Sequence, residues 1–487
     1  MREQNGFLTI VMYILLVFLC VALAVLMYLN ILANKQVNEE MAAAQAEKTY
    51  NALVQPTPAA TPEPTPEPER STTDITLAFG GDMVAQLGIT TEARQPSEES
   101  TESEEDESES ESGTVETAVY DYTAQLANIS AALEGADVSV CTLVGSMKSS
   151  AEYESYLLSP SFAEALAATG FDMIATASDH CLDFGAQALY STIEAIEGQS
   201  LINLGTSASQ ESFDLAGGLY TKVINGATFA FLTYTWATNG VSAANEPYAV
   251  NILTTDYVTD KITVDYDRLS ADLSRAKEMG ADMIVCSIAW SSNDSYYSDV
   301  RDDQRAVVDY LCENGADIIV GSGLKVPQPI ELKQVKLEDG STKNCVVAYC
   351  LGNMLNCLND QNTNLSGLLY VTLKRDMDNG EVWLSNVSYR PLFMLDTDDY
   401  EDIEEDSAEF KYRLFDLYDV VERFNRVNSG EGEQGESDKL VSDSITRDVY
   451  DAMISGAATL QNIFGTQYDA QNGGVDVVEW GKTVYTR

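Results

Sequence analysis

The chain has 487 residues, and its 28 Lys and Arg against 77 Asp and Glu give a formal net charge of −49. A surface this acidic repels phosphate backbones, so we expect no nucleic-acid partner. Hydrophobic residues make up 45% of the chain, which is enough for a large folded core. The eight cysteines have no CxxC pair or zinc spacing, and with Cys20 set aside an odd number remains, which does not predict a disulfide framework.

Residues 1–34 are predicted to form an N-terminal membrane anchor. The stretch from Phe7 to Ala33 carries no charge and, at about 27 residues, is long enough to span a bilayer. A cleaved signal peptide is the alternative, but its apolar region is normally shorter. We therefore expect a single-pass protein of the cell membrane with the bulk of the chain extracytoplasmic. Residues 35–73 follow as a helical stalk and a Pro/Thr/Glu-rich linker of extended polyproline character.

A folded domain is predicted over residues 74–395. Its first strand, Ile75 to Phe79, ends in Gly80-Gly81-Asp82. Residues 95–116 are predicted to be a disordered acidic insertion, because Ser97 to Ser112 contains no apolar residue. A solvated loop is the favoured interpretation of this insertion, and a cation-binding segment is the alternative.

Strands and helices alternate through the rest of this domain. Apolar runs predict strands at residues 136–144, 173–177, 201–204, 220–224, 229–234, 281–290, 316–321 and 345–353. Helices are predicted at residues 121–133, 160–170, 185–197, 267–279 and 302–313. Residues 367–373 and 381–389 are expected to pair as a closing hairpin. Continuous apolar strands that alternate with helices predict an α/β core with helices on its faces.

Residues 396–487 form an acidic, partly helical C-terminal segment, with helices predicted from Phe410 to Phe424 and from Leu440 to Ile463. The sequence assigns this segment no function.

The stretch from Gly170 to Gly185 contains His180, the only histidine of the chain. A short strand ends there in Ser178-Asp179-His180 and leads into a helix, which is where α/β proteins place reactive groups. A lone histidine in a turn is more often a hydrogen-bonded structural residue than a catalytic one, and we favour the structural role for His180. Asp183 is expected to cap the helix that follows.

Several short motifs recur in an order that resembles one family. They are Gly81-Asp82, the Asp179-His180 turn with Asp183-Phe184-Gly185, Trp290, Gly315 to Gly321, Gln328 to Glu331, and Tyr349 to Asn353. This order is similar to that of the capsule (poly-γ-glutamate) synthesis protein CapA family, and the resemblance covers roughly Asp74 to Pro391. It implies a calcineurin-like metallophosphatase fold, a four-layer sandwich of two sheets flanked by helices, with a metal site at the strand ends.

The family's metal ligands are only partly present. Asp82 and His180 remain, and Asp179 stands where the family has Asn. The substituted family positions are Thr142, Val144, Ser178, Ala289, Ser322, Gly323 and Lys325. Since the chain has no second histidine, the missing imidazoles have no replacement. A dinuclear centre, which needs several ligands around two ions, is therefore not expected.

The residual site is expected to consist of Asp82, Asp179 and His180. We expect no cofactor beyond one weakly bound divalent metal there, and His180 is the candidate catalytic residue. The leading hypothesis is a CapA-like protein with a degenerate metal site that binds or scaffolds in surface-polymer assembly, with a surface polymer or envelope assembly proteins as partners. One alternative is a divergent metal-dependent hydrolase or polymer-processing enzyme. The other is an acidic cell-surface protein that collects Ca²⁺.

Overall fold

The computed structural model describes residues 71–95, 118–216, 218–258, 263–290, 298–336, 340, 342–400, 403, 410–420, 423, 445–465, 475–479 and 482–485. The chain divides into two compact units, Met1–Glu69 and Arg70–Arg487, and all described residues belong to the second. The predicted anchor, nearly all of the stalk and linker, and the acidic stretch from Ser97 to Ser112 lie outside the described residues. Within the described ranges, no helix is long and apolar enough to cross a bilayer.

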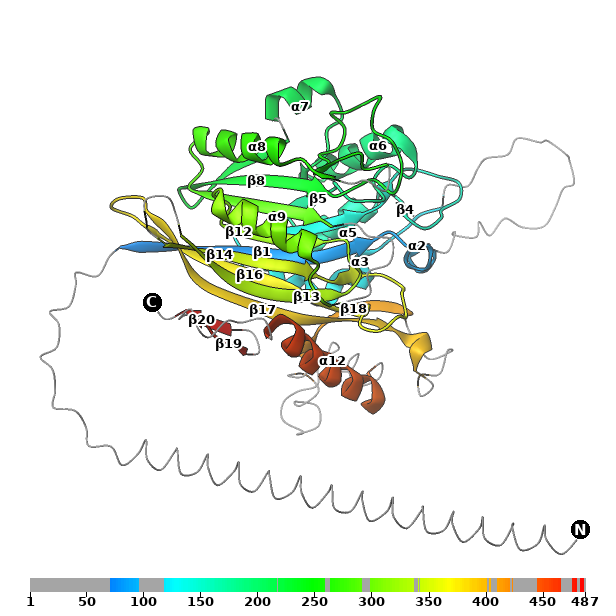
Figure 1. Ribbon diagram of the computed structural model, residues 1–487. Coiled ribbons are helices and arrows are strands. Elements are labelled where there is room, and N and C mark those ends of the chain that lie inside the picture. Colours follow the sequence, from blue (N-terminus) through cyan, green and yellow to red (C-terminus); the bar gives the residue numbers. More distant parts are fainter. Residues whose placement is uncertain are drawn as a thin grey trace, which may run out of the picture. The chain divides into compact units, whose positions relative to one another are not determined.

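Two β-sheets form the centre of this unit (Figure 1). The ten-stranded sheet has the order β19 (Val475–Glu479), β20 (Lys482–Tyr485), β17 (Val382–Asp396), β16 (Leu365–Asp376), β1 (Thr72–Val84), β2 (Val138–Val144), β5 (Met173–Ala175) and β6 (Ile202–Leu204), with β15 (Asn353–Leu355) beside β1 and β18 (Tyr412–Asp416) beside β17. The six-stranded sheet has the order β13 (Pro327–Lys336), β14 (Thr342–Leu351), β12 (Ile318–Ser322), β11 (Met283–Ala289), β8 (Ala227–Thr235) and β7 (Leu219–Ile224).

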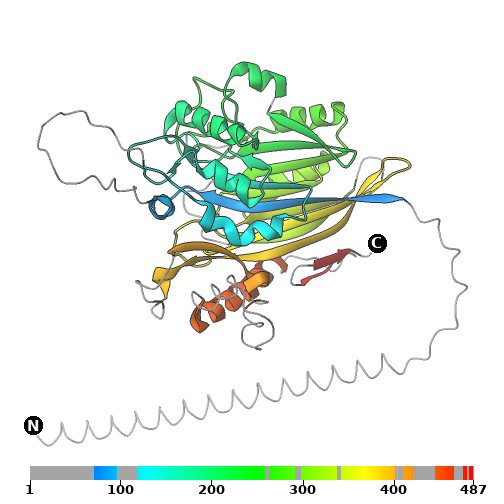
Figure 2. The ribbon, with the colours of Figure 1, turned by 180° about the vertical axis from the view of Figure 1, so that it is seen from behind.

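The two sheets pack face to face through one apolar core. Leu77 and Phe79 of β1 meet Phe229 and Phe231 of β8 in this core, and all four side chains are buried. Alternate residues of each strand point the other way and pack against helices. The result is a sandwich with a helical layer on each outer face, which confirms the predicted α/β architecture (Figure 2).

The helices on the two outer faces come from different parts of the chain. The ten-stranded sheet is covered by α2 (Leu87–Ala93), α3 (Thr123–Leu126), α4 (Ser130–Leu133) and α5 (Phe162–Thr169). The six-stranded sheet is covered by α8 (Tyr266–Glu278) and α9 (Asp302–Glu313). Further helices are α6 (Gly185–Gly198), which follows His180, and α7 (Gln210–Ala216).

Several boundaries differ from the prediction. The helix expected over residues 121–133 is interrupted by a 3₁₀ turn, Ala127–Ile129, and α5 begins at Phe162 instead of Pro160. The strand expected over residues 345–353 is two strands in two sheets, because Gly352 takes a positive φ of 83° between β14 and β15. Sequence analysis missed β13, whose prolines obscure its pattern although it pairs with β14 along its length.

The C-terminal segment also departs from the prediction. The helix expected from Phe410 to Phe424 is wrong over Tyr412–Asp416, which form β18 and pair antiparallel with β17. Tertiary pairing to an open strand edge outweighs a helical pattern of this length. The second expected helix is present as α12 (Arg447–Gly465). Its Met453 and Phe464 are fully buried in the same core as the two sheets.

Candidate functional site

Asp82 lies where β1 is hydrogen-bonded to the connection between the two sheets. The β1–β2 register shifts between Phe79 and Asp82, so Gly80 and Gly81 form a bulge. After this bulge the amide of Asp82 donates a hydrogen bond of 3.0 Å to the carbonyl of Gly352, which connects β14 to β15. A Cβ on Gly81 would lie 1.9 Å from that same carbonyl oxygen. The two backbones therefore touch here, and only glycine fits between them.

A second close approach holds the ends of β11, β12 and β14 together. The indole Nε1 of Trp290, a fully buried side chain, donates a hydrogen bond of 2.7 Å to the carbonyl of Tyr349. A Cβ on Gly321 would lie 1.9 Å from this carbonyl oxygen and 2.1 Å from Nε1. Trp290 and Gly321 therefore act as packing residues in this chain.

Asp82 is buried, with 1% of the residue exposed. Its Oδ2 accepts a hydrogen bond of 2.7 Å from the amide of Gly323, and its Oδ1 has no partner among the described residues. Burial raises the pKa of Asp82 to about 7, the hydrogen bond from Gly323 opposes this shift, and the nearby charge of Asp179 adds to it. A large part of the Asp82 population is therefore a neutral acid near pH 7.

His180 is held on three sides. Its Nδ1 lies 2.6 Å from Oδ2 of Asp183, and its ring stacks on Tyr156 at a centroid distance of 3.6 Å and an interplanar angle of 4°. Its Nε2 is 3.7 Å from Oδ2 of Asp179. The amide of Asn239 donates to Oδ1 of Asp183 at 3.3 Å. The imidazole is thus oriented by protein groups, and its structural or catalytic role stays a prediction.

The carboxylates around His180 raise its pKa. Burial alone lowers the pKa of His180, but the hydrogen bond with Asp183 and the charges of Asp179 and Asp183 outweigh burial, so the pKa is raised above its ordinary value of 6.5. Lys325 opposes the rise. Burial is also the main cause that raises the pKa of Asp179.

The proposed capping role of Asp183 is wrong. The residue at the N-cap of α6 is Phe184, and no side chain caps that end. Asp183 instead binds His180 and Asn239. Tyr156 and Asn239 are contacts that sequence analysis missed, since each is more than twenty residues from His180 and lies in a loop without a recognisable motif.

The substituted family positions lie at the same edge of the fold. Thr142 pairs with Asp82 across β1 and β2, and Val144 ends β2. Ala289 and Ser322 face one another at the ends of β11 and β12. Ser178 directly precedes Asp179, and Gly323 and Lys325 follow β12. The substituted positions are therefore gathered at one edge of the fold, close to Asp82 and Asp179 in the strand register and along the chain.

Few metal-ligating side chains gather at this edge among the described residues. In the part of the chain that the structure describes, no group of three or more His, Cys, Asp and Glu side chains is arranged to hold a metal ion. Three buried polar atoms near the strand ends nevertheless have no partner there: Asp82 Oδ1, Ser178 Oγ and Asn353 Nδ2. One ion held by Asp82, Asp179 and His180 stays a prediction.

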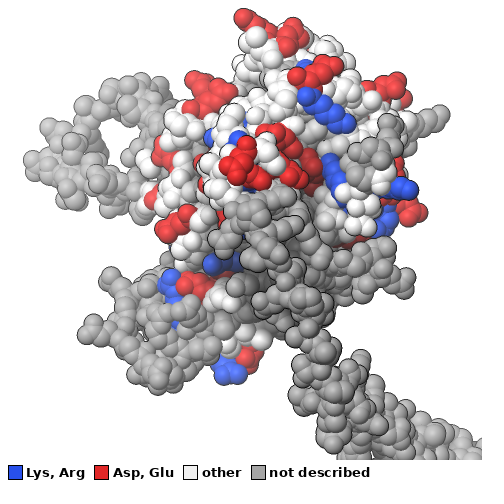
Figure 3. Space-filling model, turned by 90° about the vertical axis from the view of Figure 1, so that its left-hand side faces the viewer, with Lys and Arg blue, Asp and Glu red and all other residues white. Residues whose placement is uncertain are grey.

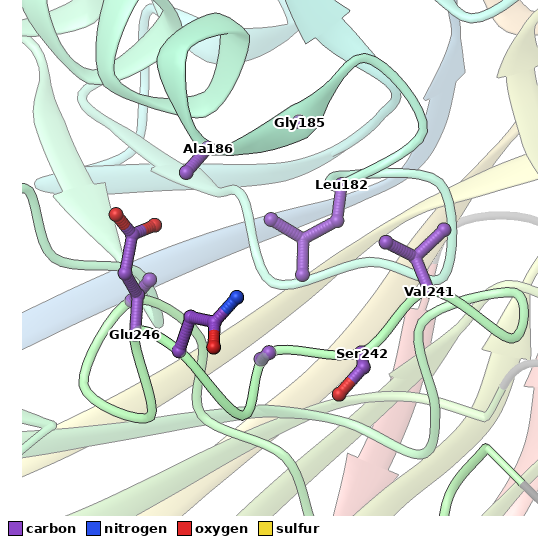
Figure 4. Close-up of a pocket in the computed structure, with 9 residues that line it drawn as sticks. Leu182, Gly185, Ala186, Val241, Ser242 and Glu246 are labelled. Carbon is purple, nitrogen blue, oxygen red and sulfur yellow. The ribbon is translucent and has the colours of Figure 1, made fainter.

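A pocket of about 210 Å³ lies at the start of α6 (Figure 4). Leu182, Gly185 and Ala186 form one wall, at the start of α6, and the loop containing Val241, Ser242 and Glu246 forms the other. The pocket is lined by apolar side chains together with the Ser242 hydroxyl, the Asn245 carboxamide and the Glu246 carboxylate.

Because His180 is the only histidine of the chain, its imidazole signal in an NMR titration needs no assignment. We expect a midpoint above 6.5 in the full chain, and a lower midpoint in Asp183→Asn, which weakens the hydrogen bond and removes the charge. Asp378→Asn, in the exposed β16–β17 turn, is the control and should leave the midpoint unchanged. An equal titration midpoint of His180 in the wild type and in Asp183→Asn would contradict the hydrogen bond between His180 and Asp183.

Comparisons with known proteins give one consistent result. A family model described as bacterial capsule synthesis protein PGA_cap matches residues 76–357. The PGA biosynthesis protein CapA of Bacillus subtilis (strain 168) is 27% identical over 206 residues, which are 42% of this chain and 48% of that relative. The capsule biosynthesis protein CapA of Bacillus anthracis is 25% identical over 195 residues, 39% of this chain and 42% of that relative. The matched region thus spans less than half the length of these relatives.

Solved structures show a fold likeness only. A 5′-nucleotidase precursor from Thermus thermophilus has a TM-score of 0.33 and 13% identity, and the match covers 66% of this chain and 54% of that one. The calcineurin-like phosphoesterase YfkN from Bacillus subtilis has a TM-score of 0.33 and 10% identity, covering 66% of this chain and 91% of that one.

Proposed function

The chain belongs to the family of bacterial capsule synthesis proteins described as PGA_cap, and from this premise we propose that it binds or scaffolds in the assembly of a surface polymer without hydrolysing it. In this proposal the protein is membrane-anchored through residues 1–34 and extracytoplasmic, its metal site is degenerate, and the polymer is capsule poly-γ-glutamate or a related one. The names of the curated relatives support the capsule context.

One observation carries the non-hydrolytic part of the proposal. The backbone amide of Gly323, at a position where the resembled family has histidine, donates to Oδ2 of Asp82 at 2.7 Å. A metal bound by this oxygen would have to share it with the hydrogen bond. The single histidine is in turn fixed by Asp183 and Tyr156. One carboxylate oxygen of Asp82 and one ring nitrogen of His180 are therefore already engaged by protein groups.

The charge of the protein favours scaffolding over direct contact with a polyanion. The net charge is −49, and on the face seen in Figure 3 acidic side chains are spread over the described part, with smaller basic patches between them. Like charges repel at the encounter stage. A basic envelope protein or a cation-neutralised polymer therefore suits this surface better than a free anionic chain does.

A second candidate function has its own observation. The unpartnered buried atoms Asp82 Oδ1, Ser178 Oγ and Asn353 Nδ2 are polar groups of the kind that coordinate or orient a bound ion or water. They favour a divergent metal-dependent hydrolase with one metal ion.

Metal content separates the two candidates. The full chain is incubated with Mn²⁺, Zn²⁺ or Mg²⁺, passed through gel filtration and measured by elemental analysis, alongside a phosphodiester hydrolysis assay. We expect well below one retained ion per chain and no hydrolysis above that of Asp82→Ala. One or two ions per chain, lost in Asp82→Ala together with a measurable hydrolysis rate, would overturn the proposal.

A further inference from the structure

Two cysteines meet in the outer core of the six-stranded sheet. Cys312 lies in the last turn of α9 and Cys345 near the start of β14, 33 positions apart in the sequence. Their Sγ atoms are 2.8 Å apart, and both residues are fully buried. This separation is shorter than a van der Waals contact between two sulfur atoms, so the backbone already places both thiols within bonding reach.

We propose that Cys312 and Cys345 form a disulfide that clamps α9 to β14 when the chain folds under oxidising conditions. This inference goes beyond the proposed function and does not depend on it. The sequence alone gave no reason to pair these two among the eight cysteines, since neither lies in a CxxC motif.

Of the other described cysteines, some lie in other cores and two share the core of the pair. Cys141 belongs to the core under α5, and Cys181 to the small core beside α6. Cys286 and Cys350 share the outer core of the six-stranded sheet with the pair, but lie on other positions of β11 and β14. Cys286 is the competitor to exclude, because it lies in the same core and the charge of Cys312 acts on its thiol.

The surroundings hold the two elements in position for the bond. Lys343, two residues before Cys345, pairs with Asp317 at 2.8 Å and donates to the carbonyl of Gly315 at 2.7 Å. Lys277 donates to the carbonyl of Asn314 at 2.7 Å. The turn after α9 is therefore fixed to β14 and α8, and a disulfide there closes on elements that are already docked.

The oxidation needs a stated electron acceptor, and a small disulfide such as oxidised glutathione fills that role. One cysteine thiolate attacks the glutathione disulfide, releases one glutathione and forms a mixed disulfide. The second cysteine then displaces the other glutathione and closes the Cys312–Cys345 bond. Two cysteine thiols lose two electrons and two protons, and one glutathione disulfide becomes two glutathione thiols.

Burial of the two thiols makes the rate of oxidation depend on whether the chain has already folded. Burial raises the pKa of Cys345 well above its ordinary value, so the attacking thiolate is scarce in the folded protein. Oxidation should therefore be fast during folding, before α9 covers β14, and slow after it. Once formed, the bond is shielded from external thiols for the same reason.

Cysteine counting tests the proposal. The full chain is refolded with a mixture of reduced and oxidised glutathione, denatured without reductant and treated with N-ethylmaleimide. We expect two of the eight cysteines to escape labelling, and a cross-link between tryptic peptides 306–325 and 344–374. Tandem mass spectrometry locates the bond at Cys345, as opposed to Cys350 or Cys357. Labelling of every cysteine, or a different pair, would overturn the proposal.

Two variants test whether the cross-link requires Cys345 in particular. Cys345→Ala should lose the cross-link, whereas Cys286→Ala, a matched buried control, should keep it. Wild type that is reduced while denatured and then refolded in reductant should melt several degrees lower than the oxidised protein, since a disulfide restricts the unfolded chain. No change in the melting temperature on complete reduction would contradict a clamp. The wild-type measurements stand even where Cys345→Ala fails to fold.

Discussion

Replacing Gly81 with Ala should lower the free energy of unfolding by about 3 kcal/mol or more, an effect at the upper end for single substitutions. The new Cβ would sit 1.9 Å from the carbonyl oxygen of Gly352, a backbone atom that cannot rotate away. Relief would require β1 and the β14–β15 connection to separate. That movement would break the hydrogen bond from the amide of Asp82 to Gly352 and open the junction of the two sheets.

Chemical denaturation followed by circular dichroism measures this loss on the full chain. Gly198→Ala, at the end of α6, is the matched control, because nothing lies within 4 Å of the place its new methyl group would take and its φ is not positive. The control should change the free energy of unfolding by less than about 1 kcal/mol. Equal stability of Gly81→Ala and Gly198→Ala would show that the two backbones are not in contact.

The Gly81 contact also shows why the ordered motifs predict the fold of this chain better than its chemistry. Gly81, Trp290, Gly321 and Gly352 belong to the ordered motifs that carry the family resemblance. In the structure they fill positions where two backbones, or a backbone and an indole, approach closely. Such residues preserve the fold whether or not a metal is bound. Their presence therefore predicts the architecture of the chain well and its chemistry poorly.

The alternating strands and helices were predictable because each has a continuous apolar run or an amphipathic period. The strand Met173–Ala175 and the helix Asp302–Glu313 were located closely for this reason. The strand β18 was not, since it exists by pairing with β17, a contact that no local pattern encodes. The same limit applies to the site. Asp183 is only three residues from His180, so a contact between them could be expected from the sequence. Tyr156 is distant in sequence and stacks on His180 from a loop in which its own φ is 71°, and no local pattern predicts that contact.

The stability of the protein should fall as pH rises through the titration of Asp82. The pKa of its carboxyl is about 7 in the folded chain against 3.8 ordinarily, so between these values the folded state binds more protons than the unfolded state. By linkage, the free energy of unfolding then decreases with pH. The loss from this one group is about 4 kcal/mol at most, since each pKa unit corresponds to about 1.4 kcal/mol, and it is complete above the folded pKa.

Comparing the wild type with Asp82→Asn isolates this group from other buried carboxyls such as Asp317 and Asp416, whose raised pKa values act in the same direction. Denaturation curves at pH 5 and pH 8 give the free energy of unfolding of both proteins. Relative to the wild type, the free energy of unfolding of Asp82→Asn should be higher at pH 8 than at pH 5, because an amide has no charge to bury. Asp378→Asn, in an exposed turn, should show no such gain. A divalent ion bound to Asp82 would instead stabilise the ionised carboxylate. With Mn²⁺ present, the free energy of unfolding of the wild type would then increase as pH rises. The sign of the pH dependence, with and without metal, therefore decides between a neutral buried acid and a working metal ligand.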